Sequence, residues 1–196
     1  MATTLSERID LRYRLTDNHV VPAVRDVTRL TQALAVSPSL VIVFNPSLDH
    51  IKETAAQVRA AGALLLVHAD MMEGVASDAA GLRFLARSGV SGVATTRTQT
   101  MQLARQAGLL VTFRAFLIDS AALETVSKIV ERNHPDIVEA LPAPILAHLP
   151  SRYIAGLGVP ILAGGLICSR ADIRAALATG ATAVSTSTES LWGAGK

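Results

Sequence analysis

Two short segments in the last quarter of the sequence combine glycine and hydroxyl residues in a way that suits an anion. Gly164 and Gly165 follow the apolar run 159–163, and the hydroxyl segment 185–187 ends another apolar run one helix length later. Glycine lacks a Cβ and tolerates positive φ, so the backbone can approach a ligand closely. The hydroxyl segment adds O–H and N–H groups before a last short helix, whose N-terminus favours negative charge. The pairing predicts a phosphate-type anion site at the ends of two successive strands.

Alternating strands and helices must position these segments. Apolar runs typical of strands occur at Val20–Val24, Leu40–Phe44, 64–68, 92–95, 109–113, Ile137–Leu141, 161–163 and 183–187. Helical patterns lie between them, near 25–36, 49–61, 76–88, 97–107, 120–133, 144–156 and 170–179. Five strands follow a glycine that suits the left-handed end of a helix: Gly62, Gly89, Gly108, Gly158 and Gly180. Ser169 with Asp172, and Thr96 with Gln99, have capping-box spacing.

This alternation predicts an α/β fold, a compact (β/α)8 TIM-type barrel whose last helix is reduced to a single turn. An open doubly wound sheet has strands of the same appearance and is the alternative. Such barrels place their functional residues at the C-terminal ends of the strands. The polar residues expected there are Arg25, Asp26, Asn45, His68, Asp70, Glu73, Arg97, Arg114, Asp119 and Glu139. Together they would suit a small, strongly polar anion that carries hydroxyl groups.

Several of these residues also have a purely structural interpretation. Asp119 precedes Ser120 and could simply cap the next helix, and His68 could be a hydrogen-bonded core histidine. Glu139, if it points inward, requires a partner such as Arg114, because an unpaired buried carboxylate is costly. A divalent cation between His68, Asp70 and Glu73 stays open as an alternative, although the prediction is that the site holds no metal.

Composition limits the class of protein. The chain has 196 residues, of which 50% are apolar and 17% charged, as expected for one globular domain over 1–196. Residues 1–19 are expected to form an N-terminal helix or arm. The longest apolar runs are too short for a membrane span and the first residues lack an apolar signal region, so a cytoplasmic location is expected. The net charge of +2 neither requires nor excludes nucleic acid. The single cysteine, Cys168, is interpreted as a packing residue.

A series of motifs across residues 64–192 resembles the glycerol uptake operon antiterminator regulatory proteins. The motifs, in order, are HADMMEG (68–74), TTR (95–97), FRAFLIDS (113–120), VEALP (138–142), PILAGGLI (160–167), AVSTS (183–187) and LW (191–192). The resemblance implies a regulatory barrel, with no catalysis and no cofactor, that senses glycerol 3-phosphate as its effector. When liganded, such a protein would act on an mRNA leader of glycerol-metabolism genes to prevent premature transcription termination.

The resemblance also implies roles for individual residues. The phosphate would be held by Gly164, Gly165, Ser185, Thr186 and Ser187. The glycerol end would be lined by Asp70, Glu73, Arg97, Arg114, Asp119 and Glu139. Contact with RNA is less defined in the sequence: the suggestive cluster is Arg8, Arg12 and Arg14, before the first strand. A basic face assembled in a homo-oligomer is a further possibility.

An enzyme on the same phosphate-binding barrel is the competing hypothesis. A phosphodiesterase, isomerase or lyase could use the strand-end carboxylates for proton transfer or for holding a metal. The lysines are Lys52, Lys128 and Lys196, and none lies at the end of a predicted strand, which argues against Schiff-base chemistry. A small-molecule binding protein with a protein partner is the third hypothesis.

Overall fold

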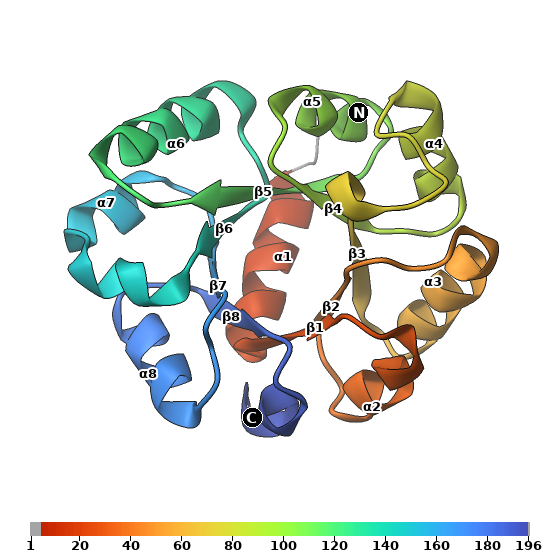
Figure 1. The fold of residues 1–196 in the computed structure, drawn as a ribbon, viewed down its shortest axis with the longest axis horizontal. Helices are drawn as coiled ribbons and strands as arrows, with labels where there is room; N and C mark the ends of the chain where they lie inside the picture. The colour runs from red at the N-terminus through yellow and green to blue at the C-terminus, as the bar shows by residue number, and fades with distance from the viewer. Residues whose placement is uncertain (1–4, 196) are drawn as a thin grey trace.

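Eight parallel strands close into a barrel in the computed structural model, which describes residues 5–195 and the side chains of residues 11–195 (Figure 1). β1 pairs with both β2 and β8, so the sheet has no edge. The strands are β1 Val20–Val24, β2 Leu40–Val43, β3 Leu64–His68, β4 Gly92–Thr95, β5 Leu110–Phe116, β6 Ile137–Leu141, β7 Ile161–Gly164 and β8 Ala183–Thr186. The predicted barrel is confirmed, and the open sheet is wrong.

The helices surround the barrel, each following its strand (Figure 1). They are α2 Leu30–Ala35, α3 Ile51–Ala60, α4 Ala79–Arg87, α5 Thr98–Gln106, α6 Ser120–Asn133, α7 Ser151–Gly156 and α8 Arg170–Ala178. Short 3-10 helices add η1 Val27–Arg29, η2 Leu48–His50, η3 Ala69–Met71, η4 Ala143–His148 and η5 Glu189–Gly195. Because η5 occupies the place of an eighth helix, the reduced last helix is confirmed. No helix in the described part of the chain is long and apolar enough to cross a membrane.

Local signals placed most helix ends correctly. The predicted glycine stops all have positive φ: Gly62, Gly89, Gly108, Gly158 and Gly180. Ser169 and Asp172 form the expected reciprocal capping box at α8. The capping box expected at Thr96 is wrong, because α5 begins after Arg97 and has no side-chain cap. Thr96 donates instead to Asp70, so a tertiary contact displaced the local one.

The helix α1, Leu5–Asp17, covers the N-terminal end of the barrel and crosses the centre of the ring in Figure 1. Leu11 and Leu15 are at most 2% exposed. They pack against buried residues at the beginnings of the strands, including Val21, Leu40 and Ile137. Burying two leucines contributes about 3–6 kcal/mol of apolar transfer free energy to closing this end. The ends of the strands that carry the predicted site therefore open on the opposite side.

The strand β5 is longer than expected, and this changes the position of one site residue. Its pattern predicted an end at residue 113, but pairing with β6 continues through Arg114 opposite Glu139 and Phe116 opposite Leu141. Arg114 is thus held by the barrel itself, with its backbone fixed by β-sheet pairing. A long charged side chain inside a strand is uncommon, and the carboxylate across the ladder explains it.

Candidate functional site

A cavity of about 270 Å³ lies where β7 and β8 end, beside the ends of β1, β2, β5 and β6. Its volume suits a small metabolite. Among the predicted phosphate residues, those lining the cavity are Gly165, Ser185, Thr186 and Ser187. Gly164 lies just behind them, since a Cβ there would be 2.7 Å from both Glu139 Oε1 and Ser185 Oγ. The structure therefore brings the two glycine and hydroxyl segments together at one cavity.

The hydroxyl groups of this segment are largely used inside the protein. Ser185 Oγ donates to Glu139 Oε1 over 2.9 Å, and Thr186 Oγ1 donates to the carbonyl of Ile167 over 2.7 Å. Thr186 Oγ1 also accepts from the backbone N–H of Thr188. These contacts hold the β7 and β8 loops against each other. An anion in the cavity would therefore rely on groups other than these two hydroxyls.

Backbone N–H groups remain for that purpose. Among the turn, loop and cap hydrogen bonds of the described residues, none uses the N–H groups of Gly165, Leu166 or Ser187. Gly165 and Leu166 have φ of +73° and +60°, an unusual pair of left-handed conformations that includes a leucine. For Leu166 this conformation costs energy, whereas glycine adopts it freely, and strained residues of this kind cluster at ligand-binding turns. Unused amides beside a cavity are a recurrent way to bind phosphate.

A buried ion pair forms the opposite wall of the cavity. Arg114 Nε donates to Glu139 Oε2 over 2.5 Å, and Glu139 is only 3% exposed. The expectation that an inward Glu139 would pair with Arg114 is confirmed. The Arg114 guanidinium also lies over the rings of Phe44 and Phe116, at 5.9 and 5.8 Å. These contacts fix the guanidinium at the cavity wall.

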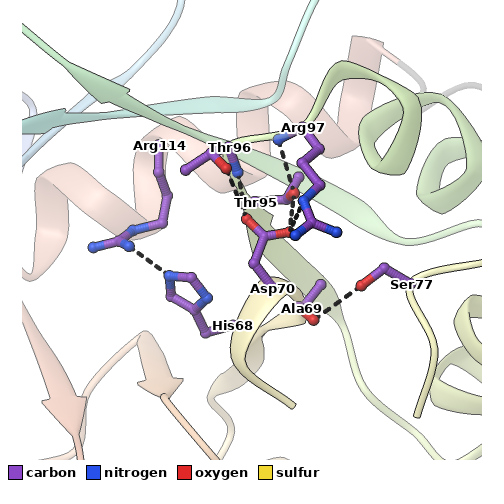
Figure 2. Close-up of polar contacts among 8 residues, drawn as sticks. All are labelled: His68, Ala69, Asp70, Ser77, Thr95, Thr96, Arg97 and Arg114. Atoms are coloured by element: carbon purple, nitrogen blue, oxygen red, sulfur yellow. Dashed lines mark hydrogen bonds and ion pairs between the residues drawn. The ribbon is translucent and has the colours of Figure 1, made fainter.

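His68, at the end of β3, lies behind this wall and contacts Phe44 and Arg114 without lining the cavity. Its ring stacks on Phe44 with centroids 5.5 Å apart, and Arg114 Nη1 donates to its Nε2 over 2.5 Å (Figure 2). Because a guanidinium can only donate, Nε2 carries no proton and the neutral ring is protonated at Nδ1. Within the described chain Nδ1 has no hydrogen-bond partner. Burial, and then the Arg114 charge, lower the pKa of His68 below its ordinary value of 6.5. The core-histidine interpretation describes this position.

The lowered pKa of His68 has a consequence for stability. Below pH 6.5 the unfolded chain takes up a proton at this ring before the folded protein does. The contribution of the neutral His68 ring to the free energy of unfolding is fully present above pH 6.5. It is lost as the pH falls toward the lowered pKa of His68 in the folded protein. We expect the free energy of unfolding, measured with urea at a series of pH values, to fall less steeply below pH 6.5 in His68→Gln. Identical pH profiles for the two proteins would contradict this assignment.

Asp70 joins two strand ends instead of lining the cavity (Figure 2). Its Oδ1 accepts from Thr95 Oγ1 over 2.8 Å, and its Oδ2 accepts from the N–H and hydroxyl of Thr96 over 2.7 and 3.0 Å. Arg97 Nε lies 3.9 Å from Asp70 Oδ1, and the Arg97 side chain is 67% exposed. Burial alone would raise the pKa of Asp70, but the hydrogen bonds from Thr96 and Thr95, helped by Arg97, lower it below 3.8. Asp70 thus holds the β3 loop to the start of α5.

The remaining predicted polar residues lie outside the cavity as well. Asp119 caps α6 by accepting from the N–H of Ala122 over 2.7 Å, and Glu73 is exposed. Among the described residues no three His, Cys, Asp or Glu side chains group as metal ligands. His68 faces Arg114, and the Asp70 oxygens face threonines, which leaves the cation alternative without a formed ligand set. Of the predicted glycerol-end residues, Arg114 and Glu139 line the cavity, whereas Asp70, Glu73, Arg97 and Asp119 do not.

The sequence did not single out two lining residues, Phe44 and Leu166. Arg25, which was expected at a strand end, also lines the cavity, with its guanidinium 5.7 Å from the Phe44 ring centroid. Phe44 ends a predicted strand, so its position was a usable signal. The packing interpretation of Cys168 is wrong, because this residue is exposed and lines the cavity. Its backbone N–H donates to Asp172 Oδ2 over 3.0 Å, just before α8 begins.

Known proteins resemble this chain along nearly its whole length. Residues 20–192 match the family model described as glycerol-3-phosphate responsive antiterminator. An uncharacterized protein of Escherichia coli K12, YgcP, is 27% identical over 93% of this chain and 95% of its own. A glycerol uptake operon antiterminator regulatory protein from Listeria monocytogenes has a TM-score of 0.80 and 28% identity, covering 88% of this chain and 94% of that one. An antiterminator-related protein from Thermotoga maritima shares the fold, with a TM-score of 0.78 and 23% identity over 89% of this chain and 98% of that one.

Proposed function

Since the chain belongs to the family of glycerol-3-phosphate responsive antiterminators, we propose that it is a regulatory protein whose cavity binds glycerol 3-phosphate. In the liganded state it binds the leader of a glycerol-metabolism transcript and prevents premature termination. The observation that carries this proposal is the set of unused backbone amides at Gly165, Leu166 and Ser187 beside the wall formed by Arg114 and Glu139.

The two sides of the cavity suit the two ends of this ligand. The amides of the β7 and β8 loops would take the phosphate, with the positive charges of Arg25 and Arg114 nearby. The glycerol hydroxyls would lie against Arg114 and Glu139, which offer a fixed donor and acceptor. Asp70 acts indirectly in this proposal, by holding the loop that precedes α5. Binding would order the surrounding loops and raise the population of the RNA-binding state.

A role without catalysis fits the same cavity. Among the residues that the structure describes, no lysine lines it, and Lys128 lies on α6 near Glu124, with an Nζ to Oε2 distance of 3.9 Å. Schiff-base chemistry would therefore lack its nucleophile. Glu139, the carboxylate in the cavity wall, is fixed by Arg114 at one oxygen and by Ser185 at the other, and its remaining lone pairs suit an acceptor for a ligand hydroxyl. We propose that the protein senses its ligand without converting it and needs no cofactor.

Calorimetry with glycerol 3-phosphate, glycerol and inorganic phosphate tests the ligand. Glycerol 3-phosphate should bind much more tightly than either part, and equal affinity for glycerol would remove the anchor. Gly165→Ala should weaken binding at least about tenfold, or about 1.4 kcal/mol. Gly158→Ala is the matched control, because Gly158 has φ of +68° with open space around it. Both variants should lose about 1–2 kcal/mol of stability from the left-handed backbone, but the control should keep its affinity.

Transcription through a leader terminator tests the regulatory role. Glycerol 3-phosphate should increase read-through in the presence of the wild-type protein, and Gly165→Ala should shift this response to higher ligand concentration. Ligand binding without any effect on read-through would leave a sensor with a different output. Turnover of a phosphorylated triose or a glycerophosphodiester would instead support an enzyme.

A further inference from the structure

Arginines gather at the end of the barrel opposite the cavity, where the helices finish. The last turns of α1, α3, α4, α5 and α6 each contain one, whereas those of α2, α7 and α8 contain no basic residue. α3 to α6 are consecutive around the ring and α1 crosses it, so the ends of these helices are neighbours (Figure 1). We call the five arginines, together with Arg12 of α1, the basic arc: Arg12, Arg14, Arg59, Arg87, Arg105 and Arg132.

Contacts between neighbouring units show that these arginines are close to one another. Arg14 Nη1 donates to the carbonyl of Gly62, at the end of α3, over 3.2 Å. Arg59 Nη1 lies 3.5 Å from where a Cβ at Gly89 would be, which places it at the turn after Arg87. Arg105 Nη1 donates to the carbonyl of Asn133 over 2.8 Å, beside Arg132. Arg14, Arg59 and Arg105 therefore each lie next to the end of a neighbouring helix.

The charges of the arc are largely uncompensated. Arg12, Arg59, Arg87 and Arg132 are exposed and make no ion pair within the described residues. The exposed carboxylates described on this end are those of Asp17 and Glu131. Arginine at a helix C-terminus complements the helix dipole, but that effect applies equally to α2, α7 and α8, which lack it. The one-sided distribution therefore points to a polyanion.

Two neighbouring features suit unpaired bases. Tyr13 follows Arg12 on α1 and is 67% exposed, so its ring offers a face on which a base could stack. At the other end of the arc, a groove of about 500 Å³ between α6 and α7 is lined by Val130, Leu157 and Val159 together with the polar residues Ser127, Glu131 and His134. Single-stranded RNA is recognised by stacking on aromatic side chains and by apolar contacts, together with arginine on its phosphates.

We propose that the basic arc is the surface that binds the phosphates of single-stranded leader RNA. This inference rests on the proposed function, and it separates the two sites: glycerol 3-phosphate binds at one end of the barrel and RNA at the other. The sequence candidates Arg12 and Arg14 belong to this surface, whereas the side chain of Arg8 lies outside the described residues. Most of the surface comes from arginines far apart in the sequence.

The test compares two double variants that remove the same charge. Arg87→Gln/Arg132→Gln changes the arc, and Arg152→Gln/Arg174→Gln changes exposed arginines of α7 and α8. The probe is a fluorescent RNA copied from the untranslated leader of a glycerol-metabolism operon, with saturating glycerol 3-phosphate, and the Kd is measured by anisotropy over a range of salt concentrations.

The arc variant should bind about tenfold more weakly, and the slope of log Kd against log salt should fall by about 1.4–1.8, or 0.7–0.9 per lost phosphate contact. The control variant should match the wild type. Thermal unfolding and calorimetry should show that both variants remain folded and bind glycerol 3-phosphate normally. An unchanged slope in the arc variant, or an equal loss in the control, overturns this inference while the proposed function stands. If the wild type binds no RNA, the RNA part of the proposed function fails together with the inference.

Discussion

Arg114→Ala should lower the free energy of unfolding by about 3–5 kcal/mol and remove measurable binding of glycerol 3-phosphate. The substitution leaves Glu139, which is 3% exposed, without its counter-charge, and it leaves Nε2 of His68 without a donor. A buried carboxylate that loses its partner keeps its full desolvation cost, and this exceeds what the pair contributes when intact. Urea unfolding followed by circular dichroism measures the first effect, and calorimetry measures the second.

A second substitution separates these two effects. Arg114→Ala/Glu139→Gln removes the uncompensated charge and should recover part of the lost stability, but not the affinity, because the cavity wall still lacks its guanidinium. Arg97→Ala is the control for losing an arginine near a carboxylate. Its side chain is 67% exposed and 3.9 Å from Asp70, so the cost should stay below about 1 kcal/mol. Equal losses in Arg114→Ala and Arg97→Ala would mean that the buried pair has no special role.

Gly164→Ala should destabilise the protein by about 2–3 kcal/mol through overpacking. The new Cβ would lie 2.7 Å from Glu139 Oε1, 2.7 Å from Ser185 Oγ and 3.0 Å from Leu141 Cδ2. Glu139 and Ser185 cannot move freely, because Glu139 accepts a hydrogen bond from Arg114 and Ser185 donates one to Glu139. The midpoint of urea unfolding should therefore move to a lower urea concentration. The affinity for glycerol 3-phosphate should fall as well, because the cavity wall moves.

Two further variants check this steric explanation. Gly164→Ala/Ser185→Ala removes one of the two closest contacts and should recover part of the stability. Gly156→Ala adds the same methyl group in α7, where nothing lies within 4 Å of the new Cβ. This control should be neutral or slightly stabilising, because alanine restricts the unfolded chain. A Gly164→Ala protein as stable as the wild type would show that the barrel relaxes around the extra atom.

The fold and one side of the candidate site follow from local patterns in the sequence. Apolar runs, helix-ending glycines and the Ser169 capping box act within a few residues, so they could be recognised without coordinates. The 164–165 and 185–187 segments were placed together for the same reason, since consecutive parallel strands must be neighbours in a barrel. Local chemistry also misled: Thr96 has capping-box spacing but donates to Asp70, which lies in η3 after β3.

What the sequence alone determined is therefore the order of strands and helices, the end of the barrel where the site lies, and the residue types that gather there. The tertiary structure decided which of those residues meet: Arg114 pairs with Glu139, 25 residues away, and with His68, 46 residues away. It also showed that Asp119 caps α6, that Asp70 holds the β3 loop to the start of α5, and that arginines of separate helices lie at the same end of the barrel. The physical reason is the distance along the chain over which each interaction acts. Hydrophobic periodicity and capping depend on near neighbours, whereas the partner of a charged side chain depends on strand register and strand length, which are fixed only when the barrel closes.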